Sequence, residues 1–589
     1  MGEQKNLFIA LGLSLVVLVL FDQLVYRPDL ERQRAAEQAA TGDNRNNAGA
    51  DGRAATGNGE ADGLSPGGSA PDADNAPVAG KKATTRAAGR VRLENPRLEG
   101  GIALDGALFD KLQLSRHKVS MEKGADKVQL LRPLEQPGSY YARFGWTADG
   151  KGSGFVPGRD SVWTADRDRL IPGEPVTLSW SNGQGLTFQQ IIRLDDRFMF
   201  TVEQRVVNDS GAPVKLAPFG LVRREGVPET SGLYILHEGA VGALDGELVE
   251  RTYGDLEDDG TFEVTDTKGG WLGITDKYWM TVLIPDQEQR LARAQMRRIT
   301  EGGVSHRVNF VQPWQVVDTG GTLSTTSRFY AGAKIVNAID DYESRYDIPL
   351  FDRAIDWGWF YFLTRPIFKG LHFFAELTGN YGVAILTLTL LIKLALFPLA
   401  NKSYVSMARM KKVQPKMKAL QERHKEDKQR LQQEMMALYK KEKVNPMAGC
   451  LPILLQIPVF FALYKVLYVT IELRHQPFFG WIQDLSAPDP LTPVNLFGLL
   501  PFDPPGFLHI GVWPILMGLS MYLMQRLQPA SASMDPAQQK IMRFLPVIFT
   551  FVLARFSAGL VIYWTTNNLL SVAQQWIIMR REEARMENK

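Results

Sequence analysis

Lys393 is the residue in this sequence whose setting most clearly suggests a function. It lies within the run Tyr381–Pro398, which is otherwise apolar apart from two threonines. A charge at the centre of a membrane helix costs about 2.5–3.5 kcal/mol on insertion scales, and such residues typically mark a path for an ion, a proton or a substrate. If this run spans a bilayer, Lys393 is therefore a candidate site that attracts negatively charged groups.

The position of Lys393 argues against a side chain that simply reaches the membrane surface. It lies about eight residues from Asn401, or roughly 12 Å along a helix axis, and a lysine side chain covers only about half of that distance. No acidic residue lies deep in any predicted span to neutralise it. We therefore expect Lys393 to face inward, into a hydrated space. Lys465 and Arg555 differ, because each lies near the outer end of its predicted span and can reach the surface.

Uncharged polar residues recur in the predicted spans. Thr389 lies one helical turn before Lys393, on the same face, and Gln456 lies between two prolines of the next span. In the last span three further candidates follow a helical stripe, namely Tyr563, Asn567 and Gln574. One such residue alone most often joins two helices by a hydrogen bond. Because these residues lie on different helices, together they predict a shared polar cavity.

The sequence shows no signature of catalysis or of metal binding. Its one cysteine, Cys450, excludes an intramolecular disulfide. Three histidines of the middle region are scattered without the spacing of metal ligands, namely His117, His237 and His306. Neither a Gly-rich phosphate loop nor a G-x-S-x-G turn is present. We therefore expect no enzyme activity, no metal and no cofactor.

The chain must contain several domains, because 589 residues are more than one domain usually contains. These domains position the residues described above. Residues 1–26 contain an unbroken apolar run, Leu7–Phe21, which predicts either a cleaved signal peptide or a membrane anchor. No small-residue cleavage site follows the run, and this favours the anchor. Residues 27–90 are rich in Ala, Gly, Asp, Asn and Pro, which predicts a flexible linker.

Residues 91–347 predict a large antiparallel β-sandwich. Short alternating runs recur, such as Val176–Trp180, Phe198–Val202, Tyr278–Leu283 and Ser324–Tyr330. Turn signals separate them, such as Asn182-Gly183, Asp259-Gly260 and Gly302-Gly303. Alternation with a period of two and frequent turns is typical of such sandwiches. A non-catalytic binding or spacer domain is the simplest interpretation, and sugar binding is the alternative.

The remaining sequence predicts one surface helix and five membrane spans. Residues 348–377 are dense in aromatic side chains with charges between them, which predicts an amphipathic helix on the outer surface of the membrane, interrupted before Pro366. The segment 378–400 predicts the second span and the segment 450–578 the last four. The apolar runs are Tyr381–Leu399, Leu451–Val469, Ile510–Met524, Ile541–Ala554 and Leu560–Ile578.

Two of these runs contain only about 15 apolar residues, although about 20 are typical of a span. Either the bilayer is thinner beside them, or polar residues at their ends complete the helices. Both possibilities remain open from the sequence.

Basic residues are concentrated in two segments. The segment 401–449 has a large basic excess, and the tail 579–589 contains Arg580 and Arg581. The loop Ile471–His509, by contrast, contains Arg474 as its one basic residue other than histidine. Since basic loops stay in the cytoplasm, we expect six spans, with both termini in the cytoplasm and the β-sandwich outside.

The segment 401–449 also predicts a helical hairpin. Apolar residues recur at spacings of three and four on both sides of the polar turn His424–Asp427. They are Met407, Met410, Val413, Met417 and Leu420 before the turn, and Leu431, Met435 and Leu438 after it. The hairpin either packs on itself with a solvated basic face, or docks on a polyanion such as ribosomal RNA.

Many short motifs follow the order found in one known family. They include Gln414-Pro415-Lys416, Gln433–Tyr439, Lys443–Pro446, Gly449-Cys450, Phe460–Tyr464, Trp481–Ser486, Gln538–Met542, Pro546–Phe549 and Gly559–Val561. By these motifs the chain resembles the YidC/Oxa/Alb family of membrane protein insertases, in its Gram-negative form with a large periplasmic domain. The likeness is dense over about Tyr381–Arg581 and looser before it.

The resemblance implies a polytopic α-helical protein of the bacterial inner membrane, with a five-helix insertase core, a cytoplasmic hairpin and a periplasmic β-sandwich. It implies an insertase and chaperone, with nascent membrane proteins, the ribosome, Sec translocon components and membrane lipids as partners, and no cofactor. In this family the five C-terminal helices enclose a hydrophilic groove, with a positive charge on the first helix. Lys393 matches that charge. Many members have arginine there, so the two-pronged binding of a carboxylate is lost here.

The resemblance also assigns roles to further residues. The positions that line the groove or the substrate path are Thr389, Gln456, Ile457, Pro458, Tyr563, Trp564 and Asn567. Candidate contacts for cytoplasmic partners are Tyr404, Lys411, Lys412 and Asp535.

Two other functions remain open from the residues alone. The alternative is a secondary transporter with its substrate site at Lys393, although the internal repeats and paired intramembrane ionisable groups typical of transporters are not found. An enzyme that processes envelope sugars would need an acid and a base paired in the β-sandwich, which the sequence does not place.

Overall fold

The computed structural model describes residues 89–148, 156–230, 236–424, 427–442, 444, 451–500, 502, 504, 508–527 and 536–587. For residues 428, 451–455, 536–540, 586 and 587 it describes the backbone alone. The predicted anchor 1–26, nearly all of the predicted linker, Cys450 and Asp535 lie outside the described residues.

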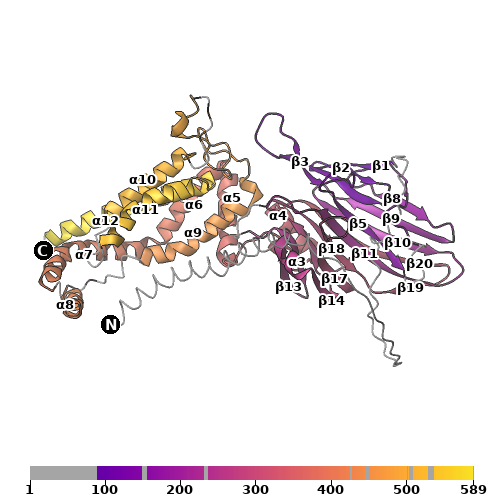
Figure 1. Cartoon of the computed structure of the whole chain (residues 1–589), viewed down its shortest axis with the longest axis horizontal. Helices are drawn as coiled ribbons and strands as arrows, with labels where there is room; N and C mark the ends of the chain where they lie inside the picture. Colours follow the sequence, from indigo (N-terminus) through magenta and orange to yellow (C-terminus); the bar gives the residue numbers. More distant parts are fainter. Residues whose placement is uncertain are drawn as a thin grey trace, which may run out of the picture. The chain divides into compact units, whose positions relative to one another are not determined.

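Residues 90–333 form two β-sheets (Figure 1). The first has the strand order β14 (Thr261–Lys268), β17 (Arg290–Ile299), β18 (Ser305–Val311), β11 (Val214–Glu225), β5 (Tyr140–Ala148), β3 (Leu108–Lys118), β2 (Leu98–Ala103), β1 (Arg90–Glu94) and β7 (Arg169–Leu170), with β19 (Gln315–Val317) beside β11 and β4 (Lys127–Leu131) beside β3. The second has the order β13 (Glu247–Thr252), β12 (Gly239–Leu244), β15 (Trp271–Thr275), β16 (Trp279–Ile284), β20 (Gly321–Ala333), β10 (Met199–Asn208), β9 (Leu186–Leu194), β8 (Val176–Ser181) and β6 (Thr164–Ala165). A short helix, α3 (Tyr253–Asp259), joins β13 to β14.

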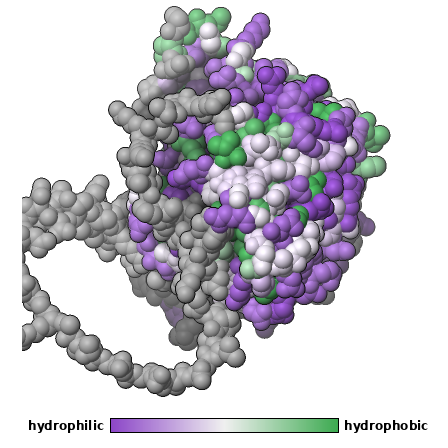
Figure 2. Space-filling view, turned by 90° about the vertical axis from the view of Figure 1, so that its right-hand side faces the viewer, coloured by the Kyte–Doolittle hydropathy of each residue, from purple (hydrophilic) through white to green (hydrophobic). Residues whose placement is uncertain are grey.

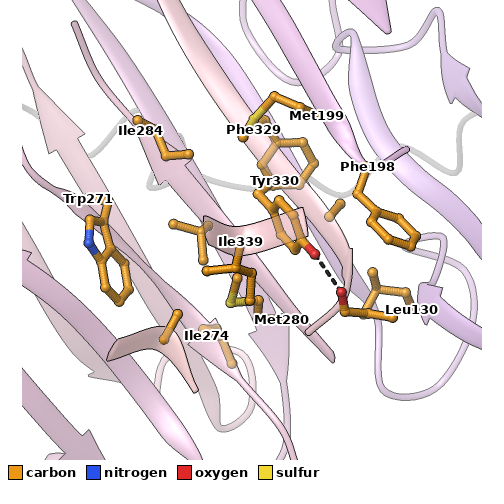
Figure 3. Packing of buried hydrophobic residues seen from close by; sticks show 14 of the residues in the cluster. Leu130, Phe198, Met199, Trp271, Ile274, Met280, Ile284, Phe329, Tyr330 and Ile339 are labelled. Carbon is orange, nitrogen blue, oxygen red and sulfur yellow. Dashed lines mark hydrogen bonds between the residues drawn. The ribbon is translucent and has the colours of Figure 1, made fainter. Parts of the chain in front are cut away.

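The two sheets pack face to face through aromatic side chains. The ring of Phe329 in β20 lies 5.5 Å from that of Phe109 in β3 and 6.2 Å from that of Phe144 in β5, measured between centroids. The side chain of Gln190 in β9 donates a hydrogen bond to the carbonyl of Phe144 in the opposite sheet, at 2.8 Å. The predicted β-sandwich is therefore confirmed. Figure 3 shows part of its core, in which Tyr330 and Met280 lie beside Ile339 of the helix that follows.

The local sequence explains the strands. Buried and partly exposed residues alternate along most of β10, as the period-two pattern predicts. Gly183 lies in the turn between β8 and β9 with φ of 70°, a conformation that glycine adopts without steric cost. The strands are antiparallel as expected, except for the short parallel pair β1–β7. The surface in Figure 2 is mostly hydrophilic or neutral, with scattered hydrophobic residues.

Three helical segments follow the β-sandwich, namely α4 (Val336–Tyr346), η3 (Phe351–Ala354) and α5 (Tyr361–Thr378). The predicted interruption before Pro366 is wrong, because Pro366 lies inside α5. A proline in a helix removes one hydrogen bond, and two ion pairs of the neighbouring Arg365, with Asp340 and Asp352, hold this turn in place. Four large apolar side chains of this region are exposed, namely Trp359, Phe362, Phe373 and Leu377.

The C-terminal part is helical (Figure 1). Its elements are α6 (Tyr381–Ala395), α7 (Phe397–Arg423), α8 (Lys428–Lys441), α9 (Leu451–Val469), η5 (Ile471–Leu473), η6 (Pro493–Asn495), α10 (Val512–Leu527), α11 (Pro536–Leu553) and α12 (Ala558–Glu587). Within the described parts of the chain, no single helix is long and apolar enough to cross a bilayer. The pair α6 and α7 meets that test together.

The predicted second span, Tyr381–Leu399, is broken. The chain bends by 66° between the end of α6 at Ala395 and the start of α7 at Phe397. Pro398 lies in the first turn of α7, where its missing N–H costs nothing, whereas one continuous helix would lose a hydrogen bond there. The expectation that Lys393 lies about eight residues from its helix end is therefore wrong.

The helical hairpin is confirmed. The seam between α7 and α8 contains Met410, Val413, Met417, Leu420, Leu431, Met435 and Leu438. The carboxylate of Asp427 accepts a hydrogen bond from the backbone N–H of Arg430 and so caps α8. Met407 differs from the expectation, because it packs with Tyr404 and Ile578 of α12.

The N-terminus of α4 is capped by a side chain from a distant segment. Its own N-cap residue, Ile335, has no side chain that can accept a hydrogen bond. Instead, Oε1 of Glu472 in η5 accepts the backbone N–H of Val336 at 2.9 Å. Oε2 of Glu472 is buried without a partner among the described residues. Burial raises the pKa of Glu472 to about 7.

We expect Glu472→Gln to stabilise the protein more at pH 8 than at pH 5. Because the folded-state pKa of Glu472 lies above its unfolded value, the native chain loses stability as the pH rises from about 4.5 to about 7. Glutamine keeps the oxygen that caps α4 and cannot ionise. Melting temperatures of both proteins between pH 5 and 8 test this, with Glu301→Gln on an exposed turn as the control. A difference between variant and parent that does not change with pH would contradict it.

Candidate functional site around Lys393

Lys393 lies in the last turn of α6 and points inward between three helices. Its ammonium group donates a hydrogen bond to Oγ of Ser571 in α12, with an Nζ–Oγ distance of 2.7 Å. Oε1 of Gln456 in α9 lies 3.5 Å from the same Nζ atom. The inward orientation agrees with the expectation from the sequence. That expectation rested on a long distance to the end of the helix, which the structure does not show. The side chain turns toward polar partners even though its helix ends only two residues later.

Polar side chains around these two partners complete the site. Oγ of Ser571 donates to the carbonyl of Asn567 at 2.7 Å, so its lone pairs remain to accept from Lys393. Tyr404 of α7 interacts with Ser571, and Tyr563 interacts with Gln456. We call these residues the Lys393 cluster: Lys393, Tyr404, Gln456, Tyr563 and Ser571.

The described partners of Lys393 are a hydroxyl and an amide, and neither carries a charge. They hold the ammonium group in place without neutralising it. A carboxylate that approaches the cluster therefore meets a positive charge in a setting partly shielded from water, where attraction is stronger than in bulk solvent. This arrangement suits transient binding of an acidic group.

The other predicted site residues lie in different surroundings. Thr389 is buried, and its hydroxyl donates to the carbonyl of Ile385 in its own helix at 2.6 Å. Asn567 is buried on α12, one turn before Ser571. Pro458 lies inside α9, where it is half-buried.

Two of the predicted residues lie on or beside apolar surface. Ile457 of α9 is 44% exposed. The ring of Trp564 lies between Phe460 of α9 and Phe549 of α11, at centroid distances of 4.6 and 5.9 Å. Many further apolar side chains of α6, α9, α10 and α11 are exposed, including Leu390, Leu394, Phe461, Ile515, Leu519, Phe544, Val547, Phe551 and Val552. Exposed apolar surface on this scale is typical of contact with lipid or with another protein.

Two contacts were not found by sequence reasoning. Ser571 was overlooked, although it lies four residues after Asn567 and so on the same helix face. The sequence predicts that Lys465 reaches the membrane surface, but it does not predict the partner of this side chain. Its Nζ lies 2.7 Å from Oδ2 of Asp356, in a largely buried ion pair. No local sequence signal joins those two residues.

The predicted cytoplasmic contact residues fall into different groups. Tyr404 is 8% exposed and belongs to the packing between α7 and α12, so its ring is not presented to a partner in this conformation. Lys411 pairs with Glu583 of α12 at 3.0 Å, and the nearby Arg409 pairs with Glu582 at 2.9 Å. Lys412 is exposed. Asp535 lies outside the described residues. In the described ranges, no group of three or more His, Cys, Asp or Glu side chains could hold a metal ion.

Comparison with known proteins gives matches along the whole described chain. Residues 373–585 match the family model described as 60Kd inner membrane protein, and residues 90–370 match the YidC periplasmic domain. The chain is 48% identical to the membrane protein insertase YidC of Methylorubrum extorquens (strain PA1) over 100% of this chain and 97% of that protein. It is 46% identical to the protein of the same name from Rhizobium meliloti (strain 1021), with the same coverage.

Among solved structures, a crystal structure of an active YidC insertase with its first transmembrane domain resolved matches 83% of this chain and 94% of that chain, at 17% identity and a TM-score of 0.34. A galactose mutarotase-like protein from Lactobacillus casei ATCC 334 matches 41% of this chain and 100% of its own, at 12% identity and a TM-score of 0.31.

Proposed function

Since this chain belongs to the YidC family of membrane protein insertases, we propose that it inserts nascent proteins into the membrane past the Lys393 cluster, and that it also assists their folding. The family is one of inner-membrane proteins with a periplasmic domain, and it is not a family of enzymes. Nascent membrane proteins are accordingly the substrates. We further propose that the protein works either alone or beside the Sec translocon.

The observation that carries this proposal is the ammonium group of Lys393, held between α6, α9 and α12 by uncharged partners. A translocated polar tail needs to enter the low-dielectric region, which is costly for charged groups. A fixed positive charge lowers that cost for acidic residues in the tail. The proposal assigns the Lys393 cluster, together with Thr389 and Asn567, to a hydrated groove around this charge.

The apolar part of the substrate needs a different route. We propose that its helix leaves along α9 and α11, because Ile457 is exposed on α9 and Trp564 bridges these two helices through Phe460 and Phe549. Partitioning of an apolar helix into lipid supplies the driving force. Pro458 lies on the same stretch of α9.

The proposed topology has six spans with both termini in the cytoplasm. The basic excess of the segment 401–449 supports this orientation. In it, α5 lies at the outer surface of the membrane, which its exposed aromatic side chains support. The hairpin of α7 and α8 then faces the cytoplasm, where Lys411 and Lys412 are candidate contacts for the ribosome. Membrane lipids surround the exposed apolar faces of the helices.

Crosslinking tests the proposed route. A photoreactive amino acid at Ile457 is expected to crosslink to a ribosome-bound nascent membrane protein. Ile515 of α10 is the matched control, because it is also isoleucine and is 41% exposed against 44% for Ile457. Equal crosslinking at both positions, or none at Ile457, would contradict the route. A secondary transporter would give no nascent-chain crosslink at either position.

A further inference from the structure

The segment between α9 and α10 is hydrogen-bonded to the N-terminal ends of α6, α10 and α12. The side chain of Asn380, the N-cap of α6, donates to the carbonyl of Phe478 at 3.2 Å. The carboxylate of Asp489 accepts the backbone N–H of Trp513 in the first turn of α10 at 2.8 Å. The backbone N–H of Gly559 in α12 donates to the carbonyl of Leu485 at 2.9 Å. These bonds fix the segment over the helix ends at which α6, α10 and α12 begin.

One stretch of this segment exposes large apolar side chains. We call residues 493–500 together with 502 the apolar tip. Its exposed members are Val494, Leu496, Phe497, Leu499, Leu500 and Phe502, and Leu499 is 81% exposed. The sequence from 490 to 502 contains no Asp, Glu, Lys or Arg. An exposed apolar surface of this kind marks a site of interaction, and a stretch of sequence without charged residues suits a lipid occupant.

Several backbone N–H groups of the apolar tip are satisfied within the segment itself. The N–H of Phe497 donates to the carbonyl of Thr492 at 3.0 Å, and the N–H of Leu500 donates to the carbonyl of Asn495 at 3.1 Å. The N–H of Gly498 donates to Oδ1 of Asn495 at 2.9 Å. Hydrocarbon offers no hydrogen-bond partners, so an irregular segment of this kind suits the boundary between headgroups and acyl chains, where water can reach the remaining carbonyls.

Two residues of the tip adopt an unusual backbone conformation. Leu496 and Phe497 have φ values of 50° and 60°, in the left-handed region that bulky side chains rarely occupy. Both side chains are 52% exposed. The chain thus keeps an uncommon turn whose large apolar groups are not used in its own core.

We propose that the apolar tip inserts into the outer leaflet of the inner membrane, so that its occupant is lipid. The tip begins beside α10, because the backbone N–H of Val512 donates to the carbonyl of Leu491 at 3.1 Å. Ile515 and Leu519 of α10 are also exposed, so the tip lies next to a helix with an exposed apolar face. The choice of the outer leaflet rests on the proposed topology. Inserted there, the tip anchors the segment that covers the helix ends.

Fluorescence quenching tests this proposal in the full-length protein. In a Cys450→Ser background, Leu499→Cys is labelled with an environment-sensitive fluorophore and reconstituted into vesicles of phosphatidylethanolamine and phosphatidylglycerol. The emission is expected to fall at least about twofold when the lipids carry a doxyl quencher, and to resist iodide in the water, as for other side chains at the acyl boundary. Val316→Cys is the control, because this valine is also exposed but lies on β19, and it should show the opposite pattern.

Two results would overturn the proposal. Quenching of the Leu499 label by iodide and not by doxyl lipid would place the tip in water. Protection from both quenchers would mean that a protein or a second copy of the chain covers it. Crosslinking at Ile457 in the same variants reports on the proposed function separately, so failure of that function and failure of lipid insertion are distinguishable.

Discussion

Lys393→Glu is expected to reduce the insertion of a substrate with an acidic outer tail by at least about tenfold, which corresponds to about 1.4 kcal/mol. Two unit charges 4 Å apart interact by about 4 kcal/mol near a protein surface, and the change to glutamate turns this attraction into repulsion. Lys393→Ala should fall between the parent and the glutamate variant, because it removes the charge without reversing it. Lys393→Arg should remain close to the parent. Insertion into proteoliposomes, measured by protease protection of the tail, gives these rates.

The same variants allow a charge-exchange control. A substrate in which the acidic residues of the tail are replaced by lysine should be inserted better by Lys393→Glu than by the parent protein. Lys123→Glu is the matched surface control, since Lys123 lies exposed in the turn between β3 and β4, and it should leave both substrates unaffected. Full activity of all three Lys393 variants on the acidic substrate would remove the basis for a role of the charge.

Asp356→Ala is expected to reduce the free energy of unfolding by about 3–5 kcal/mol, the usual cost of removing one partner of a buried ion pair. The side chain of Lys465 is 12% exposed and that of Asp356 is 20% exposed, so an unpaired ammonium group would remain poorly solvated. Asp356 also accepts the backbone N–H groups of His237 and Gly358. Denaturation of the purified protein in detergent, followed by tryptophan fluorescence, measures the change.

An exposed ion pair provides the control for this prediction. Arg169 and Glu94 lie 3.9 Å apart, and their side chains are 60% and 53% exposed. Glu94→Ala should therefore cost less than about 1 kcal/mol. In the double variant Asp356→Ala with Lys465→Met, part of the lost stability should return, because no buried charge is left without a partner. Equal costs for Asp356→Ala and Glu94→Ala would show that the Lys465 pair contributes nothing special.

Local patterns in the sequence predicted the elements that depend on nearest neighbours. The alternation in Met199–Asn208 and the glycine turn at Gly183 indicated strands, and the structure contains them. The seam of the hairpin followed from spacings of three and four. Lys393 could be recognised from the sequence alone, because a charge within an apolar membrane run is costly.

Contacts between distant segments could not be predicted in the same way. Ser571 meets Lys393, and Asp356 meets Lys465, only because the helices pack in one arrangement. Glu472 caps α4 across a similar separation. The bend at Leu396 and the unbroken α5 at Pro366 show the opposite effects of two prolines. Which effect occurs depends on the contacts that support each helix, and Arg365 supplies them in α5.

The bend between α6 and α7 lies at the junction, or pivot point, of two helical arms of very unequal length. The α7 arm has 27 residues, or about 40 Å at 1.5 Å per residue, whereas Lys393 lies only three residues, or about 4.5 Å, from Leu396. A rotation of about 10° at this pivot would displace the far end of α7 by about 7 Å and the backbone of Lys393 by less than about 1 Å. Before α7 could turn in this way, the contacts of Tyr404, Arg409 and Lys411 with α12 would have to break. The helix that supplies Ser571 to Lys393 is therefore also the one that holds the hairpin in place.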